Sequence, residues 1–153
     1  MKKWDYIIVH HSLTKDNQTV NWDAIRKYHV ETLRWADIGY HFGVEDVDGV
    51  LKIQFGRSIR QDGAHTLGRN IDSLGVVLVG NYDIEPPSRK KIEKLSELIL
   101  SLCLLFGINP VNIYPHSHYS VHKSCPGSKF NFPDFKERVI RLFRVINGVN
   151  KII

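Results

Sequence analysis

The sequence lacks several features that would place a chain of this size in a special class. Its 153 residues include only two cysteines, Cys103 and Cys125, which are too few for the disulfide framework of a small secreted domain. The first apolar stretch, Tyr6 to Val9, is far shorter than a signal peptide core or a membrane span. We therefore expect a protein that is made in the cytoplasm without a signal peptide and that does not bind membranes.

Positive charge is only moderately in excess. The chain has 21 Lys and Arg against 16 Asp and Glu, a formal net charge of +5, which favours polyanionic surroundings such as nucleic acid or cell wall. The densest basic stretch, Arg89 to Lys91, is followed by Glu93 and Glu97, as on the solvated face of a helix. Since the sequence has neither a basic helix nor a basic and aromatic stripe, we do not expect a nucleic-acid-binding domain.

Patterns typical of strands and helices alternate along the chain. Strands are expected at residues 6–9, 40–45, 50–55, 74–79 and 113–114, and helices at 22–33, between Ser88 and Gly107, and from Pro133 to Ile146. Thr19 or Asn21 is expected to cap the first helix. The length suits one domain, and no repeat or linker interrupts it. We predict that residues 1–153 form a single α/β domain with a central mixed β-sheet and helices on both faces.

The two longest predicted helices carry apolar residues at helical spacing, which are expected to face the core. These residues are Ile92, Leu95, Leu98, Ile99, Leu102 and Leu105 on the first helix, and Phe135, Val139, Leu142, Phe143 and Ile146 on the second. Cys103 lies within the first of these helices and is expected to be a core residue.

Histidine and cysteine residues gather at two places where predicted strands end. They are His10 and His11 after the first strand, and His116, His118, His122 and Cys125 in the loop after the last. This rim of an open α/β sheet is where ligands bind, and two histidines, a cysteine and an open fourth position are typical of catalytic zinc. Adjacent strand residues point to opposite faces, so only one of His10 and His11 can face a metal. Spacing alone decides neither this choice nor which loop histidine joins Cys125.

Five short segments carry motifs in a fixed order: Ile8–Ser12 (IVHHS), Asp37–Phe42 (DIGYHF), Ser73–Val76 (SLGV), Pro115–His116, and Lys123–Gly127 (KSCPG). In this order they resemble the zinc-dependent N-acetylmuramoyl-L-alanine amidases. Within that family, the chain is most similar to the branch that contains T7 phage lysozyme and the peptidoglycan recognition proteins. The resemblance extends over roughly residues 5–146, and five motifs in register make it specific.

The resemblance implies a set of site residues. It assigns one zinc ion per chain to His10, His116 and Cys125 at the rim of the sheet. Tyr40 matches the active-site tyrosine of the family, which would orient or deprotonate the attacking water and hydrogen-bond the tetrahedral intermediate. Lys123 matches the catalytic lysine of the phage-type enzymes, which would face the oxyanion or protonate the departing amine.

A glycine-rich loop, residues 56–73, resembles the wall of the family's binding groove. His65 and Thr66 in this loop are therefore expected to contact substrate. Three departures from the family pattern stand out, and one is His118, which stands where relatives often have an acidic residue. The nine-residue spacing of His116 and Cys125 is one longer than in many relatives, and Val77 stands where some branches have a glutamate base. The remaining histidines considered, His11, His29, His41 and His122, are expected to be packed or surface residues.

The activity implied by the resemblance is hydrolysis of the amide bond between N-acetylmuramic acid and L-alanine in peptidoglycan. We expect a monomer of the phage endolysin type, which acts on the cell wall and takes peptidoglycan or muropeptides as substrate. One alternative is a peptidoglycan-recognition module of the same fold without catalysis, but such relatives commonly lose a metal ligand. A second is an amidase that recycles muropeptides in the cytoplasm.

Overall fold

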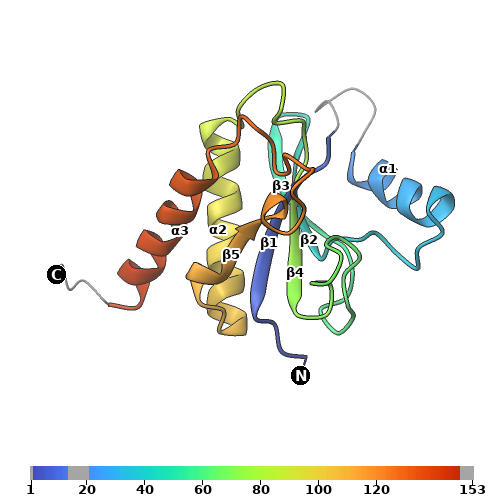
Figure 1. Ribbon diagram of the computed structural model, residues 1–153. Helices are drawn as coiled ribbons and strands as arrows, with labels where there is room; N and C mark the ends of the chain where they lie inside the picture. The colour runs from blue at the N-terminus through green and yellow to red at the C-terminus, as the bar shows by residue number, and fades with distance from the viewer. Residues whose placement is uncertain (1, 14–20, 149–153) are drawn as a thin grey trace.

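A mixed five-stranded sheet forms the centre of the computed structural model, which describes residues 2–13 and 21–148 (Figure 1). The strand order is β3-β2-β4-β1-β5. Strands β2, β4, β1 and β5 are parallel, and β3 pairs antiparallel with β2 across the turn at Asp48 and Gly49. The strands are β1 (Tyr6–His11), β2 (Phe42–Val47), β3 (Val50–Phe55), β4 (Ser73–Leu78) and β5 (Ile113–Pro115).

Helices cover both faces of the sheet, with α2 and α3 on one side and α1 on the other (Figure 1). The helices are α1 (Trp22–Lys27), α2 (Arg89–Phe106) and α3 (Phe132–Ile146), and a π-helical segment (Tyr28–Thr32) continues α1. No helix in the described part of the chain is long and apolar enough to cross a membrane. The predicted α/β architecture is confirmed.

Strand β4 shows why the sheet needs cover on both faces. All six of its residues are buried. Leu74, Val76 and Leu78 belong to the large apolar cluster under α2 and α3, whereas Val77 packs with Trp22 and other residues of a smaller cluster at α1. Because alternate strand residues point to opposite faces, a strand that is apolar throughout is stable only between two layers of helices.

The ends of the helices follow the capping residues in the sequence. The Asn21 side chain accepts a hydrogen bond from the Ala24 N–H at 2.9 Å, and Ser88 caps α2 in the same way. Gly107 ends α2 in the left-handed conformation, with φ of 67°, which a glycine adopts without steric cost. Thr19, the other candidate cap, lies outside the described residues.

Two residues that were expected to face the core are exposed instead. Leu105 of α2 is 74% exposed and Ile146 of α3 is 57% exposed, so both predictions are wrong. Leu105 lies at the margin of the apolar stripe, near the end of its helix. Ile146 is the last residue of α3, and its neighbour Val145 is exposed to the same extent. The apolar spacing therefore continues for part of a turn beyond the packed region.

His41 is a buried histidine that connects strand β4 to the glycine-rich loop by hydrogen bonds. Its Nδ1 accepts a hydrogen bond from the Gly75 N–H at 3.1 Å, and its Nε2–H donates to the Gln61 carbonyl at 3.0 Å. Burial lowers the pKa of His41 to about 4. The neutral ring thus connects β4 to the glycine-rich loop.

We predict that this histidine makes folding sensitive to acid. Between about pH 6.5 and 4 the unfolded chain binds a proton that folded His41 does not, so stability falls as the pH is lowered through this window. The loss from pH 7 to 4.5 is about 2.5 kcal/mol for this group. Urea unfolding with metal removed by a chelator measures it. The variant His41→Asn keeps an acceptor for Gly75 but does not titrate, so it should lose less stability over the same window. Equal losses would contradict the prediction.

Candidate metal centre

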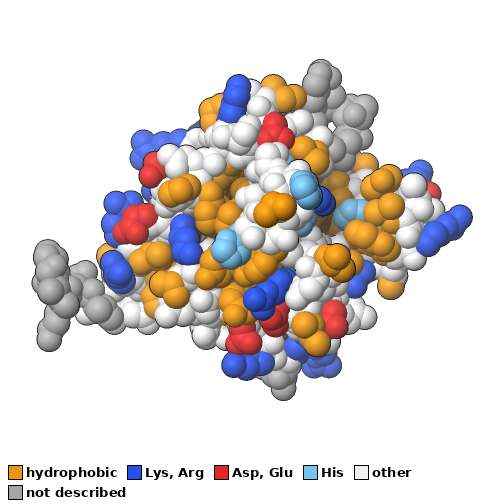
Figure 2. Space-filling view, in the orientation of Figure 1, with side chains coloured by type: hydrophobic (Ala, Val, Ile, Leu, Met, Phe, Trp, Pro, Cys, Tyr) orange, Lys and Arg blue, Asp and Glu red, His pale blue; other side chains and the backbone are white. Residues whose placement is uncertain are grey.

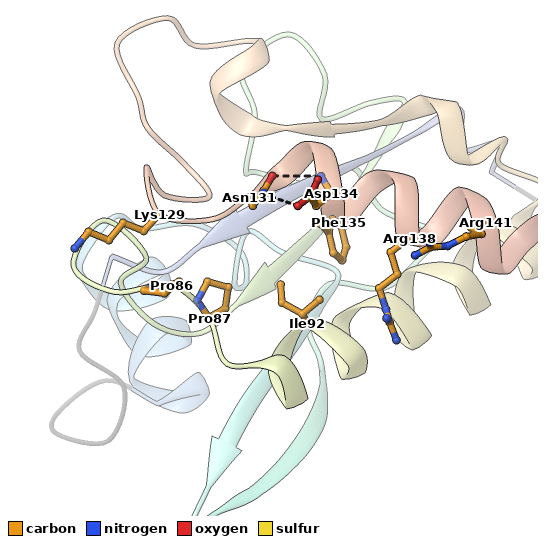
Figure 3. A pocket seen from close by; sticks show the side chains of 9 residues that line it. All are labelled: Pro86, Pro87, Ile92, Lys129, Asn131, Asp134, Phe135, Arg138 and Arg141. Atoms are coloured by element: carbon orange, nitrogen blue, oxygen red, sulfur yellow. Dashed lines mark hydrogen bonds between the residues drawn. The ribbon is translucent and has the colours of Figure 1, made fainter.

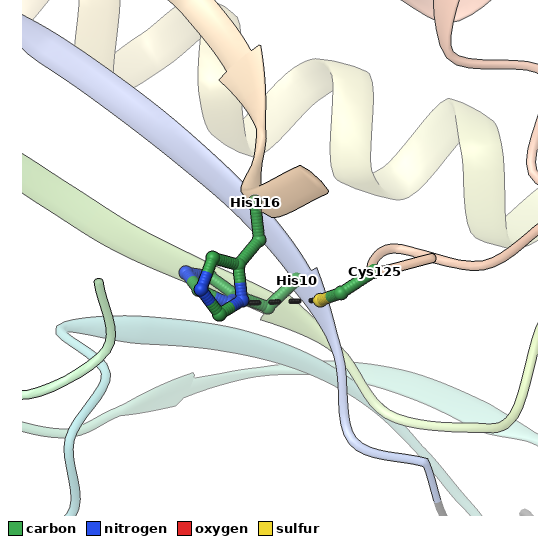
Figure 4. Close-up of side chains that lie close together, drawn as sticks. All are labelled: His10, His116 and Cys125. Atoms are coloured by element: carbon green, nitrogen blue, oxygen red, sulfur yellow. Dashed lines mark hydrogen bonds between the residues drawn. The ribbon is translucent and has the colours of Figure 1, made fainter. Parts of the chain in front are cut away.

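Three potential metal ligands from separate parts of the chain meet where β1 ends (Figure 4). His10 lies on β1, His116 begins a short 3-10 helix directly after β5, and Cys125 lies in the loop that follows. All three are buried, and one ligand atom of each lies within 4.8 Å of the other two. His10 Nδ1 is 3.7 Å from Cys125 Sγ. The arrangement presents two imidazole nitrogens and one sulfur to a common point.

The register of the sheet brings the two histidines together. Val9 on β1 lies opposite Pro115 on the parallel strand β5, so the next residues, His10 and His116, are neighbours. Their ring centroids are 4.5 Å apart. A parallel pair with this register therefore places both imidazoles at the same rim, whatever the length of chain between them.

Hydrogen bonds to neighbouring segments hold the cysteine loop in place. The Cys125 carbonyl accepts from the Ser117 N–H at 2.8 Å. The Asp83 carboxylate accepts from the Ser124 hydroxyl at 2.8 Å and from the Ser128 N–H at 2.7 Å. These bonds, the Ser128 N–H foremost, lower the pKa of Asp83. Asp83 had no signal in the sequence, because it lies more than 40 residues from the loop that it fixes.

The structure answers which histidine of β1 faces the cluster. His10 does, whereas His11 points to the other face and accepts a hydrogen bond from the Tyr82 N–H on its Nδ1 at 3.2 Å. The backbone N–H of His11 nevertheless donates to Cys125 Sγ at 3.4 Å. His11, which the sequence predicts to be a packed or surface residue, thus contributes a main-chain donor to the Cys125 sulfur.

The protonation states of the three side chains suit a metal. Burial lowers the pKa of His10 well below its ordinary value and that of His116 to about 4, so both rings are neutral at pH 7. Burial also raises the pKa of the Cys125 thiol to about 12 in the metal-free protein. A divalent cation displaces the thiol proton and leaves the thiolate as ligand. Two neutral imidazoles and a thiolate fit a cation that prefers nitrogen and sulfur.

Tyr40 and Lys123 both lie near this cluster. The Tyr40 ring is 5.1 Å from the His10 ring, centroid to centroid. Burial raises the pKa of Tyr40, and the neighbouring Cys125 raises it further, so the phenol is protonated and can donate a hydrogen bond. Lys123 is exposed, and its positive charge helps to lower the pKa of His116.

An open cavity of about 530 Å³ adjoins the cluster, within the size range of ligand sites. It is lined by Trp35, Ala64, His65, Thr66, Leu67, Asn70, His116, Tyr119, Ser120 and Lys123. Both residues predicted to contact substrate, His65 and Thr66, are in this wall. Their polar atoms lie close to His10, since its Nε2 is 3.0 Å from His65 Nδ1 and 3.4 Å from Thr66 Oγ1.

A second cavity, of about 300 Å³, lies between the start of α2 and α3 (Figure 3). Its wall is made of Pro86, Pro87, Ile92, Lys129, Asn131, Asp134, Phe135, Arg138 and Arg141. It shares no lining residue with the metal cluster.

On the face shown in Figure 2, basic and acidic side chains are interspersed rather than gathered into one charged patch.

Comparison with known proteins identifies relatives of this chain by sequence and by fold. Residues 1–128 match the family model described as N-acetylmuramoyl-L-alanine amidase. The endolysin of Enterobacteria phage T3 is 43% identical over 125 residues, which cover 78% of each chain. The human N-acetylmuramoyl-L-alanine amidase is 33% identical over 108 residues, covering 70% of this chain but only 18% of the human protein. The solved amidase LysC from Clostridium intestinale superposes with a TM-score of 0.77 at 26% identity, covering 90% of this chain and 85% of LysC. The resemblance carried by the five motifs is confirmed.

Proposed function

This chain belongs to the N-acetylmuramoyl-L-alanine amidase family, and we propose that it hydrolyses the amide bond between N-acetylmuramic acid and L-alanine in peptidoglycan. The observation that carries the proposal is the buried cluster of His10, His116 and Cys125 beside an open cavity. A module that only recognises peptidoglycan needs the cavity but has no need of three convergent ligands. We further propose a monomeric, single-domain protein of the endolysin type that acts on the cell wall.

Zinc is the metal that we propose for this cluster, one ion per chain. Two histidines and one cysteine are a known ligand set of catalytic zinc sites, in which the fourth position is left for water or substrate. When bound, zinc activates water and polarises the scissile carbonyl. His10, His116 and Cys125 would hold it, and the backbone N–H of His11 would stabilise the thiolate.

Tyr40 and Lys123 would provide the hydrogen bonding and proton transfer that the reaction needs besides the metal. None of the described residues that line the cavity carries a carboxylate, so a glutamate or aspartate base is absent from this wall. Tyr40, as a neutral phenol, would orient the substrate or the developing oxyanion by donating a hydrogen bond. The Lys123 ammonium would stabilise developing negative charge and supply a proton to the departing amine. His116 and Lys123 both line the cavity, which supports this role for Lys123.

We predict that Tyr40→Phe and Lys123→Ala each lower turnover by roughly 100-fold or more, as expected for groups that act in the transition state. Neither side chain is a ligand, so zinc content and melting temperature should change little. Steady-state turnover of cell-wall substrate, with metal analysis of each variant, measures this. The exposed His122 provides the control, since His122→Ala should keep wild-type turnover. Wild-type turnover in Lys123→Ala would show that this lysine is only part of the loop surface.

The products of digestion test the proposed activity. We expect new L-alanine amino termini without new reducing sugars, because a glycosidase would need two carboxylates that flank the cavity. Cys125→Ser should lose most of its zinc and its activity, whereas the matched control Cys103→Ala, within α2, should keep both. Mass spectrometry of digested wall and of soluble muropeptides reports the bond that is cut. Reducing ends that appear with wall clearance, or a fully active Cys125→Ser, would overturn the proposal. Cleavage of soluble muropeptides alone would favour a recycling amidase.

A further inference from the structure

The two ring nitrogens of His10 face different partners. Nδ1 lies 3.7 Å from Cys125 Sγ, on the side of the metal cluster. Nε2 lies 3.0 Å from Nδ1 of His65, with the two rings nearly perpendicular and their centroids 5.0 Å apart. One edge of His10 is therefore available to a metal, and the opposite edge is held by a second histidine that is not a ligand.

We propose that His65 is a positioning residue, which accepts a hydrogen bond from His10 and thereby fixes the ring with Nδ1 directed at the metal. This inference rests on the metal centre of the proposed function. It assigns His65 a role other than the substrate contact expected from the sequence. A histidine ligand needs such a partner, because the hydrogen bond made by one ring nitrogen decides which nitrogen is free to bind metal.

The surroundings of His65 determine which atom carries each proton. Its Nε2 is 3.4 Å from the Ser73 carbonyl oxygen, which can only accept, so Nε2 carries the proton. In a neutral ring, Nδ1 then holds a lone pair and accepts from the Nε2–H of His10. His10 is left with its lone pair on Nδ1, the nitrogen on the metal side. The Thr66 hydroxyl, 3.0 Å from His65 Nδ1 and 3.4 Å from His10 Nε2, is compatible with this tautomer.

Neighbouring residues of the glycine-rich loop and of β4 hold His65 in place. A Cβ on either Gly63 or Gly75 would overlap the ring, so these glycines leave the slot that it fills. Asn70 Oδ1 accepts from the backbone N–H groups of both His65 and Thr66, at 2.8 and 2.9 Å. His65 itself is buried. The ring is thus packed against the backbone at Gly63 and Gly75, and Asn70 holds the main chain of His65 in place, as required of a group that orients another.

A matched pair of variants tests the inference. Asparagine and leucine have similar shapes, but only asparagine retains an acceptor attached to Cγ, where histidine has Nδ1. We expect His65→Leu to weaken zinc binding by about 10- to 100-fold, the usual effect of losing such a partner, and His65→Asn to retain most of the affinity. Competition with a chromophoric chelator, in the absence of substrate, measures the zinc affinity. Circular dichroism checks that both variants fold.

The protonation of His10 gives a second measurement that needs no variant. Nitrogen-15 NMR of the zinc-loaded wild-type protein should show the Nε2–H tautomer of His10, and a proton on Nδ1 would overturn the inference even if the leucine variant failed to fold. Equal zinc affinities of the leucine variant and the wild type would also overturn it, and a raised KM in that variant would then point to substrate contact. A wild-type protein that binds zinc in this way but cleaves no amide would contradict the proposed function alone.

Discussion

The parallel pairing of β1 with its two neighbours is the constraint on which the site depends. Strand β1 lies between β4 and β5, and the register of β1 against β5 makes His10 and His116 neighbours across more than 100 residues of sequence. Helices on both faces bury this part of the sheet, so His10 and His116 are held where the buried strands β1 and β5 end. The cysteine comes from a loop, and hydrogen bonds to Asp83 and Ser117 supply the order that a strand would otherwise give.

Burial does two things at this centre. It keeps the histidines neutral, which leaves their lone pairs available to a cation, and it keeps the metal-free cysteine protonated. A bound divalent cation reverses the second effect and not the first. The same burial applies to His41 and His65, whose pKa values fall to about 4 and about 3. Burial therefore keeps four histidines in and around the cluster uncharged at pH 7: His10, His41, His65 and His116.

Sequence reasoning predicted the elements whose signals are local. Apolar runs marked β1 and β4, Asn21 and Ser88 marked helix starts, and Gly107 marked a helix end, because capping and burial act over a few residues. The π-helical continuation of α1 was not foreseen, since it has the same apolar spacing as a longer α-helix. The choice between His10 and His11 followed only from the family resemblance. The contribution of Asp83 depends on a tertiary contact that spacing does not encode, and so does the contact of His65 with His10.

The central claim is that His10, His116 and Cys125 bind one zinc ion at the rim of the sheet, and X-ray absorption spectroscopy of the zinc-loaded protein tests it most directly. The account predicts one sulfur ligand at about 2.3 Å and two imidazole nitrogens at about 2.0 to 2.1 Å, with the remaining position filled by a light atom such as oxygen. A spectrum without sulfur, or one with two sulfur ligands, would contradict it, because Cys125 is the one cysteine of the chain that reaches this cluster within the described residues.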